Sequence, residues 1–379
     1  MDTSQMRKLT PTTHRQSIYI FENGKKYINF SSNDYLNLGT NEILRKNFLE
    51  QILAEKTPFT ENLFSEALFS SSSARLLSGN SAPYTRLENF IAKWYEKEAA
   101  LCFNSGYHAN LGIIAGLMQK NDCIFSDKLN HNSILAGIKQ SNADFFRYKH
   151  CDCSHLEDLL KKHRKEYKNA LIVSESVFSM DGDSASLADL IFLKEKYDCT
   201  FMLDEAHGIG VLGRDAQGLC NEKENFIPKI DIIMGALGKA FGSQGAYCTA
   251  DKAIIDRLIN FAPTFIFSTA LPPIQILWTE YLLTECMGFI LQQQKKLKNL
   301  LQEFSLSSQI VPVIIGENED TVNIANHLRE KGFFVLPVRP PTVPLHTARL
   351  RLSLCADMKP AQLAQLFSEL EACKCSMNG

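Results

Sequence analysis

Two short segments of the chain place a carboxylate, an imidazole and a lysine directly after apolar runs. Residues 204–207 (DEAH) follow the run 200–203, and residues 235–239 (GALGK) follow the run 231–234. A lysine among small, apolar neighbours is suited to covalent attachment of a carbonyl compound. A buried carboxylate such as Asp204 can keep a pyridine nitrogen protonated, and His207 could reach a ring hydroxyl. Lys239, Asp204 and His207 therefore predict pyridoxal-phosphate chemistry.

A phosphate-binding turn and a flat side chain complete this set. Residues 104–107 (NSGY) stand between a predicted strand and a predicted helix, where Ser105, Gly106 and Tyr107 can offer backbone N–H groups to a phosphate. His131 follows another apolar run and could stack on the cofactor ring. Because ligands of parallel sheets bind at the carboxyl ends of the strands, we expect these segments to meet at one sheet edge.

Each of these residues also has an ordinary structural interpretation. Lys239 could be a solvated lysine, and Asp204 could cap a turn. His131 could begin a helix with only local hydrogen bonds, and Ser105-Gly106 could be a plain strand–helix turn. The convergence of all four after predicted strands favours the catalytic interpretation.

The elements that must hold these residues alternate between short apolar runs and helical patterns. This alternation predicts an α/β fold, with a mostly parallel sheet that helices cover on both faces. The predicted strands are 99–103, 122–126, 170–174, 200–203 and 231–234, and the predicted helices are 110–118, 133–140 and 187–197.

The two ends of the chain have a different pattern. A smaller α+β unit is predicted from helices at 281–304, 321–331 and 360–372 and from strands at 308–315, 332–337 and 348–354. A hairpin is expected at 18–30, around Asn23-Gly24. We therefore expect residues 1–40 to pack with a small domain at 285–379, and residues 41–284 to form the large domain.

Composition excludes several classes of protein. The 379 residues carry a formal charge of −2 without a block of like charges, which argues against nucleic-acid binding. Residues 1–13 lack the apolar centre of a signal peptide, and no run of about 18 apolar residues predicts a membrane span. Eleven scattered cysteines are typical of reduced thiols, so we expect a cytoplasmic protein.

Two further motifs suggest other functions. Residues 208–213 (GIGVLG) match a dinucleotide-binding fingerprint, but a polar segment follows where that fingerprint needs an apolar helix. Residues 150–155 (HCDCSH) resemble a metal site, but Ser154 and Glu157 predict a capping box before a helix at 155–163. We therefore expect no nicotinamide cofactor and no metal.

Five segments resemble the α-oxoamine synthases, which are fold-type I pyridoxal-phosphate enzymes. The segments are 31–36 (SSNDYL), 75–79 (RLLSG), 178–183 (FSMDGD), 204–208 (DEAHG) and 238–242 (GKAFG), and the resemblance runs from about residue 27 to 372. It implies a homodimer that condenses an amino acid with an acyl thioester. It also implies a large, mostly parallel seven-stranded sheet domain and a smaller α+β domain.

The resemblance implies a role for each site residue. On the cofactor side, Lys239 would form the covalent link and transfer protons, Asp204 would pair with the ring nitrogen, and His207 and Ser179 would lie near the ring oxygen. His131 would stack on the ring, and Ser105, Gly106 and Tyr107 would contact the phosphate. On the substrate side, Arg351 would bind the amino-acid carboxylate and Asn33 would orient the amino acid, whereas Arg339 and Arg7 are candidates for the end of the acyl chain.

Within the family, residues 339–344 (RPPTVP) and 348–352 (ARLRL) most resemble members that join L-alanine to a pimeloyl thioester in biotin synthesis. The thioester would be on coenzyme A or on an acyl carrier protein. Two alternatives stay open. The chain could use glycine or serine with another acyl-CoA, or it could be a non-catalytic subunit of the same fold that stabilises a partner.

One position departs from the family pattern in a way that affects the cofactor. The family usually has Thr or Ser three residues before the lysine, whereas this chain has Ala236. The lost hydrogen bond to phosphate would cost about 1.5–3 kcal/mol. We expect Ser243 or a residue of a partner subunit to compensate.

Overall fold

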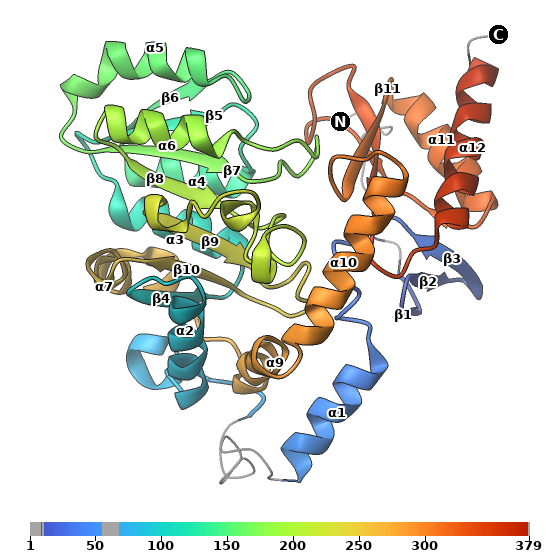
Figure 1. Ribbon diagram of the computed structural model, residues 1–379, viewed down its shortest axis with the longest axis horizontal. Helices are drawn as coiled ribbons and strands as arrows, with labels where there is room; N and C mark the ends of the chain where they lie inside the picture. The colour runs from blue at the N-terminus through green and yellow to red at the C-terminus, as the bar shows by residue number, and fades with distance from the viewer. Residues whose placement is uncertain (1–8, 10, 55–67, 378–379) are drawn as a thin grey trace. The chain divides into compact units, whose positions relative to one another are not determined.

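The computed structural model describes residues 9, 11–54 and 68–377, and the side chains within them up to residue 373. The chain forms two compact units (Figure 1). Unit one contains residues 1–42, 179–183 and 292–379, and unit two contains residues 43–178 and 184–291. Among the described residues, no helix has the length and apolar character needed to cross a membrane.

Unit two is built on a seven-stranded sheet. The strand order is β4-β10-β9-β8-β7-β5-β6, for β4 (Ala99–Phe103), β5 (Cys123–Asp127), β6 (Asp144–Tyr148), β7 (Ala170–Glu175), β8 (Thr200–Asp204), β9 (Ile232–Ala236) and β10 (Ala246–Ala250). Strand β10 is antiparallel to both β4 and β9, whereas the strands from β9 to β6 are mutually parallel. The mostly parallel sheet predicted from the sequence is therefore confirmed.

Helices pack on this sheet through apolar side chains. Ile113, Ile134 and Leu258 contribute from three helices to one core with residues of β5, β7, β8, β9 and β10. The helices between residues 42 and 303 are α1 (Glu42–Leu53), α2 (Ala82–Trp94), α3 (Gly106–Leu117), α4 (Asn132–Ser141), α5 (Cys153–His163), α6 (Leu187–Lys196), α7 (Lys252–Phe261), α8 (Pro263–Ile266), α9 (Pro273–Thr284) and α10 (Met287–Glu303). A π-helix, η2, lies at Arg75–Gly79, and 3-10 turns lie at Arg164–Glu166, Arg214–Ala216, Leu219–Asn221 and Ile227–Lys229.

Among the described residues, unit one contains two small sheets, two whole helices and the larger part of α10. One sheet has the order β1-β2-β3-β12, for β1 (His14–Gln16), β2 (Tyr19–Glu22), β3 (Lys25–Asn29) and β12 (Phe333–Phe334). The other has the order β11-β14-β13, for β11 (Ile310–Gly316), β13 (Pro337–Val338) and β14 (Ala348–Ser353). The whole helices are α11 (Asn318–Glu330) and α12 (Pro360–Met377). The predicted hairpin is confirmed, because Asn23 and Gly24 join β2 to β3 with φ of 49° and 75°.

Three expectations about local structure were wrong. The predicted strand 332–337 is two strands, β12 and β13, which belong to different sheets. The predicted helix 281–304 is divided between α9 and α10. Helix α5 begins at Cys153, because the Asp152 side chain, not that of Ser154, accepts the His155 N–H at 2.8 Å.

Candidate active site

Asp204 ends the central strand β8 and is 3 % exposed. Its Oδ1 accepts the Ala206 backbone N–H at 2.8 Å, and its Oδ2 accepts Nδ2 of Asn110 at 2.7 Å. Asn110 lies on α3, is buried, and also donates to Ser133 Oγ at 3.0 Å. Both carboxylate oxygens therefore have N–H donors, which fixes the carboxylate where a cationic ring nitrogen could meet it. Sequence reasoning did not identify Asn110.

Lys239 and His207 are directly paired. Lys239 lies in the turn after β9, and its Nζ is 2.9 Å from Nε2 of His207, which is buried after β8. Strands β8 and β9 are parallel neighbours, so their carboxyl ends bring the two side chains together. The structure therefore places a lysine amine and an imidazole within hydrogen-bonding distance, next to the segment that carries Asp204.

His131 belongs to the same set, although the residue is partly exposed to solvent. It is the N-cap of α4, and its Nδ1 lies 2.7 Å from Ser133 Oγ. Partial burial lowers the pKa of His131, the Asp204 charge raises it, and the Lys239 charge lowers it again. The net downward shift favours a neutral imidazole at neutral pH, which suits a ring that stacks on a cofactor.

Glu175 binds the backbone of His131 through a hydrogen bond. It was not among the predicted site residues. It ends β7, is 2 % exposed, and its Oε1 accepts the His131 backbone N–H at 2.5 Å. Burial, followed by the negative charge of Asp204, raises the pKa of Glu175 well above its usual range. Its position in the sequence, directly after a buried strand, was the signal that could have identified it.

The predicted phosphate turn stands at the start of α3. Ser105 is the N-cap, and its Oγ accepts the His108 N–H at 3.2 Å and lies 2.8 Å from Nδ1 of His108. Gly106 approaches the end of β9 closely, since a Cβ at this position would lie 3.3 Å from Cβ of Ala236. Tyr107 is exposed. The first N–H groups of a helix are a ready anion site, so Ser105, Gly106 and Tyr107 fit a phosphate.

The hydroxyl of Ser243, which could replace the one that Ala236 lacks, is hydrogen-bonded within the protein. Gln275 Nε2 donates to Ser243 Oγ at 2.7 Å, and Thr279 Oγ1 lies 2.7 Å from the same oxygen. Thr279 gives its own proton to the Gln275 carbonyl, so Ser243 must donate to Thr279. Compensation by Ser243 therefore stays a prediction, and it would require the Ser243 O–H to turn from Thr279 to the phosphate.

Unit one brings together Arg351, Asn33 and the backbone of Ser179. Arg351, on β14, donates through Nη1 to Asn33 Oδ1 at 3.0 Å and through Nε to the Ser179 carbonyl. It also contacts Ser353 Oγ at 2.6 Å and Tyr35 Oη at 3.2 Å. No acidic side chain pairs with Arg351 within the described residues. The positive charge of the guanidinium is therefore not offset by these pairs and can attract the carboxylate of a ligand.

The remaining two predicted substrate-binding residues are Arg339 and Arg7. Arg339 follows β13 and precedes the cis Pro340-Pro341 bond. Arg7 lies outside the described residues. The cofactor-side residues other than Ser179 lie in unit two, where a lysine, an imidazole, a fixed carboxylate and a helix N-terminus fit pyridoxal phosphate.

Comparison with known proteins shows the family to which the chain belongs. Residues 25–370 match the aminotransferase class I and II family, and the chain belongs to this family. It is 41% identical over 378 residues to the 8-amino-7-oxononanoate synthase of Haemophilus ducreyi, with 96% of each chain covered. A crystal structure of the enzyme of that name from Francisella tularensis has a TM-score of 0.72, 28% identity, and coverage of 93% of this chain and 98% of that chain.

A more distant structure supports the fold. A variant of the serine palmitoyltransferase of S. paucimobilis, solved with a bound PLP-myriocin aldimine, has a TM-score of 0.85 at 24% identity and covers 96% of this chain and 92% of its own. The resemblance to α-oxoamine synthases, the fold-type I class and the pyridoxal-phosphate cofactor are thus confirmed. The individual site residues stay predictions.

Proposed function

We propose that this chain joins L-alanine to a pimeloyl thioester, with loss of CO2, to form 8-amino-7-oxononanoate for biotin synthesis. The observation that carries the proposal is the Lys239–His207 pair at 2.9 Å, on adjacent strand ends with Asp204. Full-length identity of 41% to a protein named for this reaction supports the choice of substrates.

The residues of unit two would perform the proton chemistry. When bound, pyridoxal phosphate supplies an aldehyde that reacts with amines and a ring that accepts electrons. Lys239 would remove the α-proton of alanine at Nζ, with His207 as its hydrogen-bonding neighbour. Asp204, fixed by Asn110, would keep the ring nitrogen protonated. His131 would cover the ring as a neutral imidazole.

The residues of unit one would bind the amino acid. Four of the five N–H groups of Arg351 already donate to protein oxygens, so one Nη2 N–H can meet the alanine carboxylate directly. A bidentate pair with that carboxylate, a geometry that Lys cannot reproduce, would replace one of these bonds. Asn33 and Tyr35 hold the guanidinium through neutral oxygens, so its charge stays available. Arg339 and Arg7 are proposed for the distal end of the acyl chain, on either a coenzyme A or a carrier-protein donor.

We further propose that the enzyme is a cytoplasmic homodimer. The cysteines for which the structure describes a state are all free thiols, which suits a reducing compartment. Leu77, within η2, and Phe267, at the end of α8, are 82% and 83% exposed, and the two helices pack together. Ala74 and Thr269 form a β-bridge between the same two segments. Apolar side chains gathered in this way favour coverage by a second copy.

The test is product formation by the purified chain with pyridoxal phosphate, L-alanine and pimeloyl-CoA. Mass spectrometry should detect 8-amino-7-oxononanoate, and Lys239→Ala should form none, while the surface variant Lys252→Ala should match the wild type. Borohydride reduction should attach the cofactor to the peptide that contains Lys239.

Substituting glycine or serine for alanine separates the alternatives. Faster turnover with glycine or serine would show that this amino acid, not alanine, is the substrate, and the reaction class would be unchanged. A purified chain that binds no cofactor and forms no product with any of the three would instead indicate the non-catalytic subunit.

A further inference from the structure

Two carboxyl groups lie side by side at the carboxyl edge of the large sheet. Glu175 ends β7 and Asp204 ends β8, and the two residues are partners in the parallel register. Neighbouring strands are about 4.8 Å apart, and register partners project from the same face of a sheet. Glu175 is 2 % exposed and Asp204 is 3 % exposed. The two carboxyl groups are therefore neighbours in a region with little water.

Two neighbouring buried carboxyl groups cannot both carry a charge without a large cost in free energy, so one of them keeps a proton. Both oxygens of Asp204 accept N–H groups, from Ala206 at 2.8 Å and from Asn110 at 2.7 Å. Within the described residues, Glu175 accepts one N–H, that of the His131 backbone, through Oε1 at 2.5 Å. Because N–H donors stabilise the charged form, Asp204 is the anion and Glu175 keeps the proton on Oε2.

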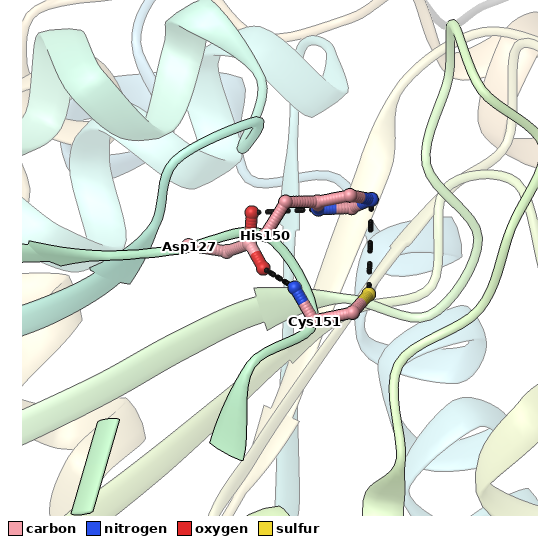
Figure 2. A group of neighbouring side chains, drawn as sticks. All are labelled: Asp127, His150 and Cys151. Carbon is pink, nitrogen blue, oxygen red and sulfur yellow. Dashed lines mark hydrogen bonds and ion pairs between the residues drawn. The ribbon is translucent and has the colours of Figure 1, made fainter. Parts of the chain in front are cut away.

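Asp127 shows that burial alone does not decide the protonation state. It ends β5, on the other side of β7, and is fully buried. The backbone N–H groups of Leu129 and Cys151 donate to it at 2.8 and 2.9 Å, and Nδ1 of His150 lies 2.9 Å from Oδ1 (Figure 2). Asp127 therefore has donors on both oxygens, which suits a carboxylate, whereas Glu175 has one donor for two oxygens.

The charges near Glu175 act in both directions. Burial has the largest effect on its pKa, followed by the negative charge of Asp204, and both raise it. The positive charge of Lys239 and the His131 N–H lower this pKa, and Asp127 adds a smaller upward effect. The net shift is strongly upward, which agrees with the proton that the geometry assigns to Glu175.

A neutral carboxyl group still accepts a hydrogen bond through its carbonyl oxygen, so a protonated Glu175 can hold the His131 backbone. His131 is the N-cap of α4, and its ring is fixed separately, with Nδ1 2.7 Å from Ser133 Oγ. Glu175 thus fixes the backbone of His131, and Ser133 fixes the ring.

We propose that Glu175 is a positioning residue, which holds the His131 backbone with a neutral carboxyl group. The inference rests on the proposed function, in which His131 covers the cofactor ring and Asp204 pairs with the ring nitrogen. A neutral Glu175 leaves the one negative charge of Asp204 opposite one protonated ring nitrogen. A charged Glu175 would add a second negative charge beside Asp204, at a cost in free energy.

Infrared difference spectroscopy of the full-length chain tests the protonation state before any cofactor is added. The spectrum of wild type minus Glu175→Gln at neutral pH should contain the C=O band of a protonated carboxylic acid. The control, wild type minus Glu157→Gln, should contain carboxylate bands instead, because Lys196 and Lys161 pair with Glu157. Carboxylate bands in the Glu175 difference spectrum would overturn the proposal.

Binding of pyridoxal phosphate tests the positioning role. Glu175→Gln keeps an acceptor for the His131 N–H, so the circular dichroism that the bound cofactor acquires should match that of the wild type. Glu175→Leu removes the acceptor, and the signal should fall as it does in His131→Ala. Combining these last two substitutions should cause no further loss, because Glu175 acts through His131.

The outcomes separate this inference from the proposed function. Additive losses in the double variant, or an unchanged signal in Glu175→Leu, would show that Glu175 does not position His131 and would leave the proposed reaction intact. A wild type that binds no cofactor would overturn both the proposed function and the positioning role, whereas the infrared spectra would still show whether Glu175 holds the proton.

Discussion

At the scale of single residues, Ala236 is the position of the cofactor set where the family pattern has a hydroxyl and this chain has none. Asp204, Glu175 and Lys239 each have a polar partner, whereas the methyl group of Ala236 faces the start of α3 beside Gly106. Ser243 could replace the missing donor only if its O–H turned from Thr279 to the phosphate. Cofactor affinity should therefore be limited at this one position.

Replacing Ala236 by Thr should tighten the binding of pyridoxal phosphate. A hydroxyl donor to a charged phosphate is worth about 1.5–3 kcal/mol, which corresponds to a dissociation constant lower by at least about tenfold. Equilibrium dialysis of the cofactor measures the change. Ala236→Val has the same shape without the hydroxyl and should give no gain. Equal affinity of the Thr and Val variants would refute a role for the hydroxyl.

Glu205 should make stability depend on pH. It is fully buried, its Oε1 accepts the Cys220 N–H at 2.8 Å, and burial raises its pKa from 4.5 to about 7. Between these values the folded state holds a proton that the unfolded chain has lost. The free energy of unfolding therefore falls as pH rises from 4.5, by roughly 3 kcal/mol in total, and it stops falling above pH 7.

Urea unfolding at pH 5 and pH 8 measures this contribution. Glu205→Gln cannot lose a proton, so its loss of stability between the two pH values should be smaller than that of the wild type by about the same 3 kcal/mol. A pH dependence that is identical in the two proteins would show that Glu205 does not titrate in this range.

At the scale of elements, the sequence predicted those strands whose residues are apolar throughout. The predicted strand 99–103 has the same bounds as β4, and β5, β7, β8 and β9 differ from their predictions by one or two residues. Strand β6 was missed because it is an edge strand with mostly accessible side chains, including Asp144 and Phe145. Strand β10 was missed because it is short and begins and ends with Ala, which is depleted in strands, and because its burial comes from both neighbouring strands.

The start of α5 was also predicted incorrectly, and the correction can be tested. Asp152→Ala should destabilise the protein by about 0.5–2 kcal/mol, because it removes the acceptor of the His155 N–H. Ser154→Ala should have almost no effect, since Ser154 is inside the helix. Chemical denaturation of both variants provides the comparison. A larger loss in Ser154→Ala would restore the predicted capping box.

The site shows the same limit of prediction. Asp204, His207 and Lys239 could be predicted because each follows a buried strand, and strand order in a parallel sheet brings such ends together. Asn110 could not, because its role depends on how the first turns of α3 pack beside β8, which no local pattern encodes.

At the scale of the whole molecule, the apolar side chains around η2 and α8 lead to a prediction about assembly. Leu77→Asp combined with Phe267→Asp should shift the protein to a smaller species, since buried unpaired carboxylates would oppose association. Light scattering after gel filtration measures the mass. Phe192→Asp, at an exposed position on α6, is the matched control and should keep the wild-type mass. An unchanged mass in the double variant would exclude this surface from the dimer interface.

The composition of unit one has a consequence for how the chain folds as it is synthesised. Strand β3 emerges from the ribosome early, whereas its parallel partner β12 and the Arg349 that pairs with Asp181 emerge only near the end. The seven strands of unit two, by contrast, are all complete by Ala250. A nascent chain stalled after α9 should therefore hold a formed large sheet and an N-terminal sheet that still lacks β12, which must stay soluble until translation ends.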